Sequence, residues 1–233
     1  MVLPESDGRN PKHALGISIA LIVVYWCLFA ARQWFRDPGV ARTTEGIFAG
    51  ACIRAAITAF AVWALMGLTR EGWRSLGFKI ERPVVFAFWT LAWSAGLFIT
   101  INVVLGSLMA TLFGAHGTPA IAELFRDPAS APLWIASAII GGGFAEELLR
   151  AFVLTRFERA FGRIGLVVAL VVDTIVFGLG HLYQGPVGAF SAGMSGLFLA
   201  FVFLRRRRVI DAMAVHAVFD LMGIAAAYAL YAN

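Results

Sequence analysis

The segment 141–152, GGGFAEELLRAF, places two adjacent glutamates and an arginine inside an otherwise apolar run. An ionisable side chain at the centre of a bilayer costs roughly 2.5–3.5 kcal/mol on insertion scales, so each one needs a specific role. Glu146 and Arg150 are four positions apart, share one face of a helix and can pair. Glu147 lies about 100° further round, so one glutamate can be held by Arg150 while the other faces a cavity. The three glycines would let a neighbouring helix approach closely.

Two further motifs place histidines at helical spacing. In FGLGH, Phe177 and His181 are four residues apart, and Asp173 lies one turn earlier on the same stripe. In HAVFD, His216 and Asp220 have the same spacing. An aspartate at this position can accept a proton from the imidazole and fix its tautomer.

The ionisable residues inside apolar runs are Arg54, Glu146, Glu147, Arg150, Asp173, His181, Asp211, His216 and Asp220. All but Arg54 fall between residues 146 and 220. One polar site between facing helices explains this grouping better than three unrelated packing contacts. A carboxylate there can act as general base towards water. Imidazole and carboxylate ligands can instead hold a divalent metal that acidifies water. Both chemistries indicate hydrolysis within the membrane.

The elements that must position this site are membrane-spanning helices. The chain is 60% hydrophobic with a mean hydropathy of +0.81, and several apolar runs approach the ~20 residues that cross a bilayer. We predict seven spans, at 14–31, 47–68, 84–113, 133–157, 164–182, 187–204 and 209–230. The third is long enough to be tilted or broken, and a split would make eight. The fold class is an all-α polytopic transmembrane bundle, with a polar catalytic cavity between the fourth, fifth and seventh spans.

We expect a short cytoplasmic tail over residues 1–13 and a single transmembrane domain over 14–233, with its motif-bearing core at about 133–225. The first apolar run lacks the small-residue cleavage site of a signal peptide. Cys27 and Cys52 fall inside predicted spans, which favours buried thiols over a disulfide or a metal site.

The basic residues are distributed unevenly between the loops. Thirteen lie on the amino-terminal side: Arg9, Lys12, Arg70, Arg74, Lys79, Arg82, Arg156, Arg159, Arg163, Arg205, Arg206, Arg207 and Arg208. Four lie on the other side: Arg32, Arg36, Arg42 and Arg126. This asymmetry predicts a cytoplasmic amino terminus and an outer carboxyl terminus. The RRRR run then contacts lipid headgroups, and we expect no nucleic-acid partner.

These motifs resemble those of the CPBP intramembrane proteases, which comprise the type II CAAX prenyl endopeptidases and the bacterial Abi or bacteriocin-processing proteins. That family carries EExxxR, FxxxH and HxxxN or HxxxD on successive core helices, and FGLGH and HAVFD fit the second and third. WRSLGF at 73–78 is also typical, and the resemblance covers roughly residues 70–225. It implies a protein of the bacterial plasma membrane that acts on a peptide or lipidated peptide.

The first motif departs from the family, because EELLR has two residues between the second glutamate and the arginine instead of three. Either Arg150 is in register, or the glutamate pair is. The resemblance implies that Glu146 or Glu147 is the general base and that His181 positions water or a metal. It also implies that His216 and Asp220 stabilise the oxyanion, supported by Arg150 and Phe177.

Two mechanisms stay open for this endopeptidase: water activated by glutamate alone, or water bound to a metal such as zinc. The ligands of that metal would be His181, His216 and Glu147. From the residue spacing alone, Glu146 lies ~15 Å, His216 ~12 Å and His181 ~27 Å from the cytoplasmic edge. A non-catalytic membrane immunity or partner-binding protein of the same fold is the alternative. A proton-coupled transporter is a third hypothesis, against which the lack of an inverted repeat argues.

Overall fold

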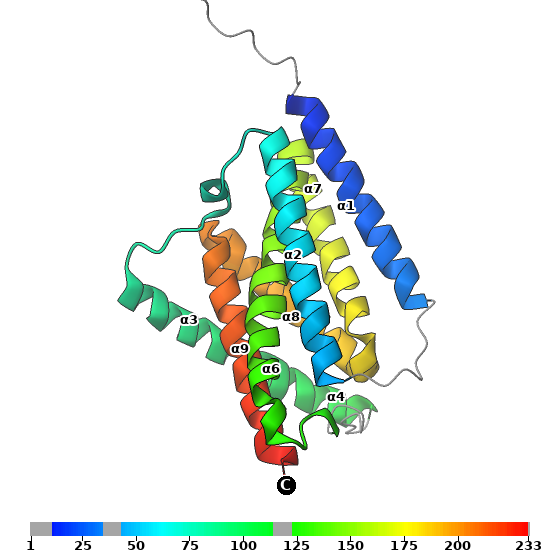
Figure 1. The fold of residues 1–233 in the computed structure, drawn as a ribbon, viewed down its shortest axis with the longest axis vertical. Helices are drawn as coiled ribbons and strands as arrows, with labels where there is room; N and C mark the ends of the chain where they lie inside the picture. Colours follow the sequence, from blue (N-terminus) through cyan, green and yellow to red (C-terminus); the bar gives the residue numbers. More distant parts are fainter. Residues whose placement is uncertain (1–10, 35–42, 114–122, 233) are drawn as a thin grey trace, which may run out of the picture.

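The computed structural model describes residues 11–34, 43–113 and 123–232, and these residues form helices and short connections without a strand (Figure 1). The α-helices are α1 (Pro11–Trp34), α2 (Thr44–Leu68), α3 (Pro83–Phe98), α4 (Gly106–Phe113), α6 (Ala131–Ser137), α7 (Glu147–Gly180), α8 (Gly185–Arg206) and α9 (Val209–Tyr231). Two π-helical segments are η2 (Ile99–Leu105) and η4 (Ala138–Glu146). Three short 3₁₀ turns are η1 (Trp73–Leu76), η3 (Pro128–Ser130) and η5 (Leu182–Gln184). Most of the tail at residues 1–13, together with Arg9, Arg36 and Arg42, lies outside the described residues.

Six helical stretches of the described chain are long and apolar enough to cross a membrane. The longest, Pro128–Gly180, is interrupted by Gly162, whose φ of 63° and ψ of −148° are not helical. The chain reverses there, and the ion pair between Arg150 and Asp173 joins the two arms (Figure 1). This stretch therefore contains two of the predicted spans, 133–157 and 164–182. The total of seven or eight membrane crossings stays a prediction.

The third predicted span, 84–113, forms α3, η2 and α4 in succession. In Figure 1 this stretch runs obliquely across the steeper helices of the bundle. The π-helical turn η2 lies in its middle, where Thr100 and Asn102 bond back to the carbonyls four residues earlier. Such back-bonding often bends a helix. The three segments therefore form one irregular helical stretch that lies oblique to the rest of the bundle.

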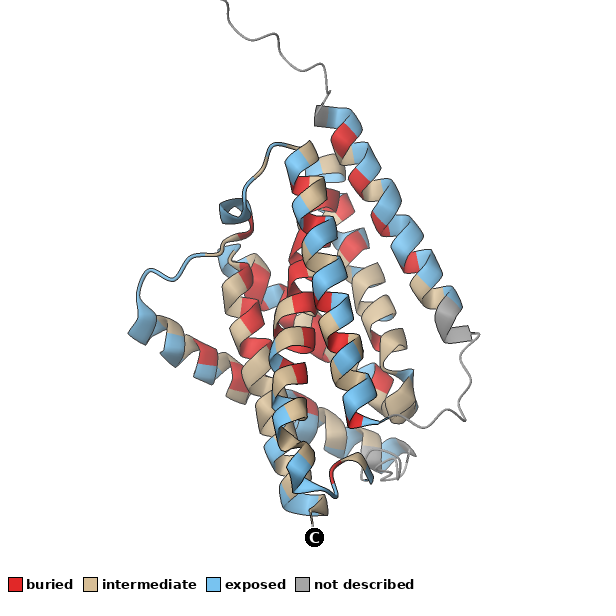
Figure 2. Cartoon of the chain, viewed as in Figure 1, coloured by how far each residue is buried: buried red, intermediate tan, exposed pale blue. Residues whose placement is uncertain are grey.

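Small and large apolar side chains fill the interior of the bundle, while the outward faces of the helices are also apolar (Figure 2). Along α2, Ile53, Ile57 and Phe60 are each at least 60% exposed. A water-soluble protein of this size rarely exposes such a continuous apolar surface, so these faces suit a lipid environment. Cys27 is exposed and Cys52 half-buried, both as free thiols. The prediction of a buried thiol was wrong for Cys27, because it lies on an outward face of α1.

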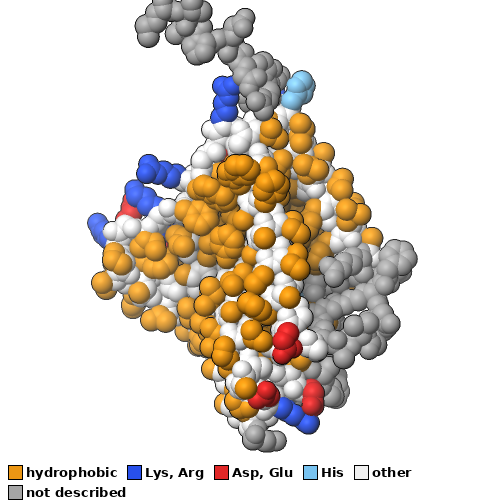
Figure 3. Space-filling model, in the orientation of Figure 1, with side chains coloured by type: hydrophobic (Ala, Val, Ile, Leu, Met, Phe, Trp, Pro, Cys, Tyr) orange, Lys and Arg blue, Asp and Glu red, His pale blue; other side chains and the backbone are white. Residues whose placement is uncertain are grey.

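Three loops predicted to share the amino-terminal side meet at one end of the bundle. Arg207 donates to both carboxylate oxygens of Glu158, at 2.5 and 2.8 Å. A Cβ added at Gly77 would overlap the backbone of Arg207, so the loop after α2 touches the turn after α8. Asp211 pairs with Arg208 at 2.9 Å, as expected for the basic turn. Figure 3 shows basic side chains mainly towards this end of the visible face.

Glu71 ties the loop after α2 to α7. It accepts hydrogen bonds from Arg156, which is buried, and from Arg159 at 2.5 Å. Burial raises the pKa of the Glu71 carboxyl, but hydrogen bonds from Arg156, Thr69 and Arg159 outweigh that effect and hold the pKa below its ordinary value. A carboxylate of lowered pKa contributes stability that is fully present above its unfolded pKa, about 4.3, and is lost as the pH falls through its folded pKa.

We expect Glu71→Gln to lower the melting temperature in detergent at pH 6–7. The difference from the unsubstituted chain should shrink as the pH falls below about 4.3. Thermal unfolding followed by circular dichroism across this pH range measures it. Glu81→Gln is the control, since Glu81 is exposed and pairs with the exposed Lys79. An equal effect of both substitutions at every pH would contradict this role for Glu71.

Candidate active site

The glycines before the glutamates bring η4 against α9. A Cβ at Gly142 would clash with the carboxylate of Asp220 and would lie 3.3 Å from Nε2 of His216. A Cβ at Gly143 would lie 2.9 Å from the carbonyl oxygen of Met213. The expectation that these glycines allow a close helix approach is confirmed, and the helix they admit carries the third motif. π-helical segments of this kind occur frequently at functional sites.

Glu147 is locked in place by buried partners. Its Oε1 atom accepts hydrogen bonds from Arg150 and from Nδ1 of His216 at 2.8 Å. The Nε of Arg150 donates to Oδ2 of Asp173 at 3.0 Å. Glu147 and Arg150 are only 1% and 2% exposed, respectively. Asp173 therefore belongs to the site, although no family motif includes it; its signal in the sequence was its place on the stripe of Phe177.

The structure separates the roles of the two glutamates. Arg150 pairs with Glu147 three residues earlier, which decides between the two glutamates that the sequence left open. Positions three and four residues apart both face each other on a helix, so the spacing allowed either pair. Glu146 instead receives a hydrogen bond from Nη1 of Arg54 on α2, at 3.1 Å. The isolated ionisable residue of the second span thus completes the polar cluster.

Each ring nitrogen of His216 faces at least one carboxylate. Because Nδ1 donates to Glu147, the ring is fixed in orientation. Its Nε2 atom lies 3.6 Å from Oδ2 of Asp220 and 4.0 Å from Oε2 of Glu146. Both distances exceed those of direct hydrogen bonds and are of the kind that a bridging water spans. The Glu146 side chain is 17% exposed, so it is the more accessible of the two glutamates.

Phe177 is the centre around which the second motif packs. The guanidinium of Arg150 stacks on its ring at 4.5 Å, and the His216 ring meets it at 6.2 Å. His181 caps the end of α7, where its Nδ1 donates to the carbonyl of Phe177 at 2.9 Å. Its ring lies 4.7 Å from that of Phe177. Phe177 is thus in direct contact with the Glu147 cluster, and His181 lies one turn further along α7.

The residues expected to ligate a metal do not form a ligand set. Among the described residues, no group of three His, Cys, Asp or Glu side chains is arranged to hold a metal ion. Oε1 of Glu147 is committed to Arg150 and His216, and Nδ1 of His181 to a backbone carbonyl. We therefore derive no step through zinc or another ion.

A membrane-embedded helical bundle with an accessible glutamate beside a carboxylate-oriented imidazole defines a site suited to acid–base chemistry. The family model described as "Type II CAAX prenyl endopeptidase Rce1-like" matches residues 128–222. This match confirms the resemblance to the CPBP/CAAX protease family over the part of the chain that carries the three motifs. The matched range includes every motif residue, whereas Arg54 lies outside it. No curated protein and no solved structure matches the chain.

Proposed function

We propose that the protein is an intramembrane endopeptidase in which Glu146 activates water. The observation that carries this proposal is that the two glutamates have different surroundings. Glu147 is buried and held by Arg150 and His216. In contrast, Oε2 of Glu146 lies 4.0 Å from Nε2 of His216, and Oδ2 of Asp220 lies 3.6 Å from the same nitrogen. A general base must be accessible and close to its water. Of the two glutamates, Glu146 meets both conditions.

In this mechanism a water molecule lies between Glu146, His216 and Asp220. Glu146 takes its proton through Oε2 while the oxygen attacks the scissile carbonyl. Protonated His216 donates from Nε2 to the developing oxyanion, and its Nδ1 remains bonded to Glu147. When the carbon–nitrogen bond breaks, Glu146 returns the proton to the leaving amine. Asp220 acts by orienting the imidazole.

Phe177 and Arg150 act as supports, since they contact Glu147 and His216 rather than the substrate. His181, at the end of α7 beside Tyr183 (ring centroids 5.9 Å apart), is proposed to position the peptide. The proposed substrate is a peptide or lipidated peptide near the cytoplasmic leaflet of a bacterial plasma membrane. The clustering of basic loops supports a cytoplasmic amino terminus and an outer carboxyl terminus. The non-catalytic alternative is not favoured, because the shifted spacing of EELLR still brings both glutamates to His216.

The test of this function is cleavage in detergent of a pool of CAAX-type and bacteriocin-leader peptides, read by mass spectrometry. The unsubstituted protein is compared with the Glu146→Gln, Glu147→Gln double variant. We expect products from the former only, and their masses identify the cleaved bond. Cleavage by both would contradict the assignment of the site, and elemental analysis of the same preparation would reveal a stoichiometric metal if one takes part.

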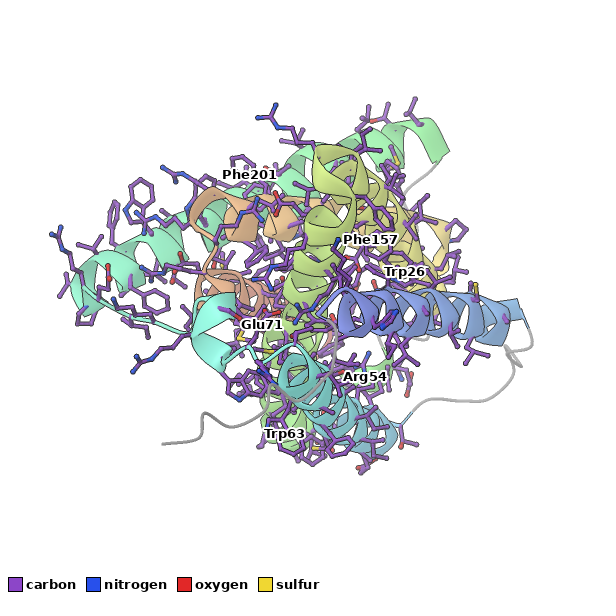
Figure 4. All side chains as sticks on the ribbon, turned by 90° about the horizontal axis from the view of Figure 1, so that it is seen from above. Trp26, Arg54, Trp63, Glu71, Phe157 and Phe201 are labelled. Atoms are coloured by element: carbon purple, nitrogen blue, oxygen red, sulfur yellow. The ribbon has the colours of Figure 1, made fainter. Side chains whose placement is uncertain are left out.

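Arg54 is proposed as a positioning residue, because it bonds Glu146 and not the reacting atoms. Its side chain is half-exposed, and Gly141 leaves it room, since a Cβ there would lie 3.3 Å from Nη2 (Figure 4 labels Arg54). A hydrogen bond between charged groups contributes about 1.5–3 kcal/mol. We expect Arg54→Gln to lower kcat at least about tenfold with little change in KM, and Arg54→Lys to recover part of it. Steady-state kinetics measures this.

The control is Arg163→Gln, which removes an exposed charge outside the site. A rise in KM alone on replacing Arg54 would contradict the positioning role and indicate substrate binding instead.

A further inference from the structure

An open apolar groove of about 490 Å³ lies between the oblique third helical stretch and α8. Its volume is within the range of small-ligand sites, about 300–1,000 Å³. The lining residues are Thr100, Ile101, Val104, Leu105 and Leu108 of η2 and α4, Leu170 of α7, and Met194, Leu197, Phe198, Phe201 and Leu204 of α8.

The groove offers a ligand no free hydrogen-bonding side chain. Thr100 is its one polar lining residue, and the hydroxyl donates to the carbonyl of Gly96 at 2.7 Å. A polar ligand would leave its own groups unsatisfied there, which is costly in an apolar site. The lining therefore suits a hydrocarbon chain.

A basic side chain lies at the end of the α8 wall. Along α8, Phe198, Phe201 and Arg205 are three and four residues apart and share one face. The guanidinium of Arg205 packs over the rings of Trp89 and Trp93, at 5.5 and 5.3 Å. The Trp93 ring in turn contacts Phe198 and Phe201. Through Trp93, the arginine therefore lies next to the aromatic wall of the groove.

Arg205 has no acidic partner among the described residues, in contrast to Arg207 and Arg208. Arg207 pairs with Glu158 and Arg208 with Asp211, but no carboxylate of the described chain lies within 4.0 Å of the Arg205 guanidinium. A guanidinium stacked on aromatic faces keeps its N–H edge free and pre-organised for a phosphate. Basic pockets between membrane helices are known to hold anionic lipid headgroups.

We propose that this groove binds one anionic phospholipid of the leaflet at the basic end, with an acyl chain along α8 and the phosphate at Arg205. The groove is distinct from the site at Glu146, which Arg54 contacts: seen from above in Figure 4, Arg54 and Phe201 lie on opposite sides of the bundle. The proposal does not depend on protease activity, so binding and cleavage can fail independently.

The test is native mass spectrometry of the delipidated full chain, titrated with phosphatidylglycerol or with phosphatidylcholine of the same acyl chains. We expect phosphatidylglycerol to bind at least about fivefold more tightly, because one arginine near an anionic headgroup contributes about 1 kcal/mol, a factor of about five. Arg205→Gln should remove this preference, and Arg163→Gln, which removes an exposed charge elsewhere, should keep it.

A second pair of variants tests the groove itself. Val104 lines it and is 61% exposed, while Val103 beside it is 54% exposed and lies outside the lining. We expect Val104→Trp to weaken phosphatidylglycerol binding at least fivefold and Val103→Trp to leave it unchanged. The proposal would be overturned if Arg205→Gln and Arg163→Gln changed the preference for phosphatidylglycerol equally. It would also be overturned if Val104→Trp and Val103→Trp weakened phosphatidylglycerol binding equally. Displacement of the lipid by a farnesylated peptide would also overturn it, since the groove would then belong to the substrate.

Discussion

Replacing Glu146 by glutamine is expected to lower the cleavage rate roughly 10²–10⁴-fold, the usual contribution of a general base. The amide keeps the size of the side chain and can still contact Arg54, but it cannot take a proton from water. Because Glu146 is partly exposed and outside the buried cluster, the melting temperature should change little. Product formation per folded protein, with unfolding measured on the same sample, is the required measurement.

Glu147→Gln is the matched comparison, since it changes the neighbouring residue in the same way. Glu147 is buried between Arg150 and His216, so its replacement should lower stability as well as activity. If Glu147→Gln lost activity with unchanged stability while Glu146→Gln stayed active, the roles of the two glutamates would be reversed.

Arg150→Met should be the most destabilising single substitution in the molecule. Arg150 is the shared partner of Glu147 and Asp173, and its removal leaves two buried carboxylates without their cation. Breaking a buried ion pair by removing one partner costs about 3–5 kcal/mol. We expect a large fall in the yield of folded protein and in the melting temperature in detergent.

Neutralising all members of this cluster distinguishes charge from packing. The triple variant combines Arg150→Met with Glu147→Gln and Asp173→Asn, so the arginine and both of its carboxylate partners are neutral. Its stability should therefore be higher than that of Arg150→Met alone, although activity does not return. Arg163→Met, at an exposed arginine, is the control for loss of a positive charge. A triple variant as unstable as Arg150→Met would show that the arginine acts mainly through its packing on Phe177.

The sequence was sufficient for the features that depend on local pattern. Apolar length predicted the helices, and the spacing in FGLGH and HAVFD predicted which side chains share a face. The family match over 128–222 confirmed the resemblance built on these motifs. The reversal at Gly162 also falls between two predicted spans.

Features that depend on helix geometry or on distant partners were not predictable. Helical spacing left open which glutamate Arg150 holds, because residues three and four positions earlier both lie near it, and the structure gives Glu147. Arg54 lies 92 residues before its partner, and no spacing rule links the two. The prediction that the Cys27 thiol is buried was wrong, because hydropathy does not distinguish the core of a bundle from its lipid-facing surface.

The most direct test of the proposed chemistry is a single turnover in water labelled with oxygen-18, using a peptide that the protein cleaves. If Glu146 is a general base, the first product carries one labelled oxygen in its new carboxylate, and the Glu146→Gln variant gives none of this product. An unlabelled first product would contradict the mechanism, because the oxygen would then come from a carboxylate nucleophile of the protein. So would full activity in the Glu146→Gln variant.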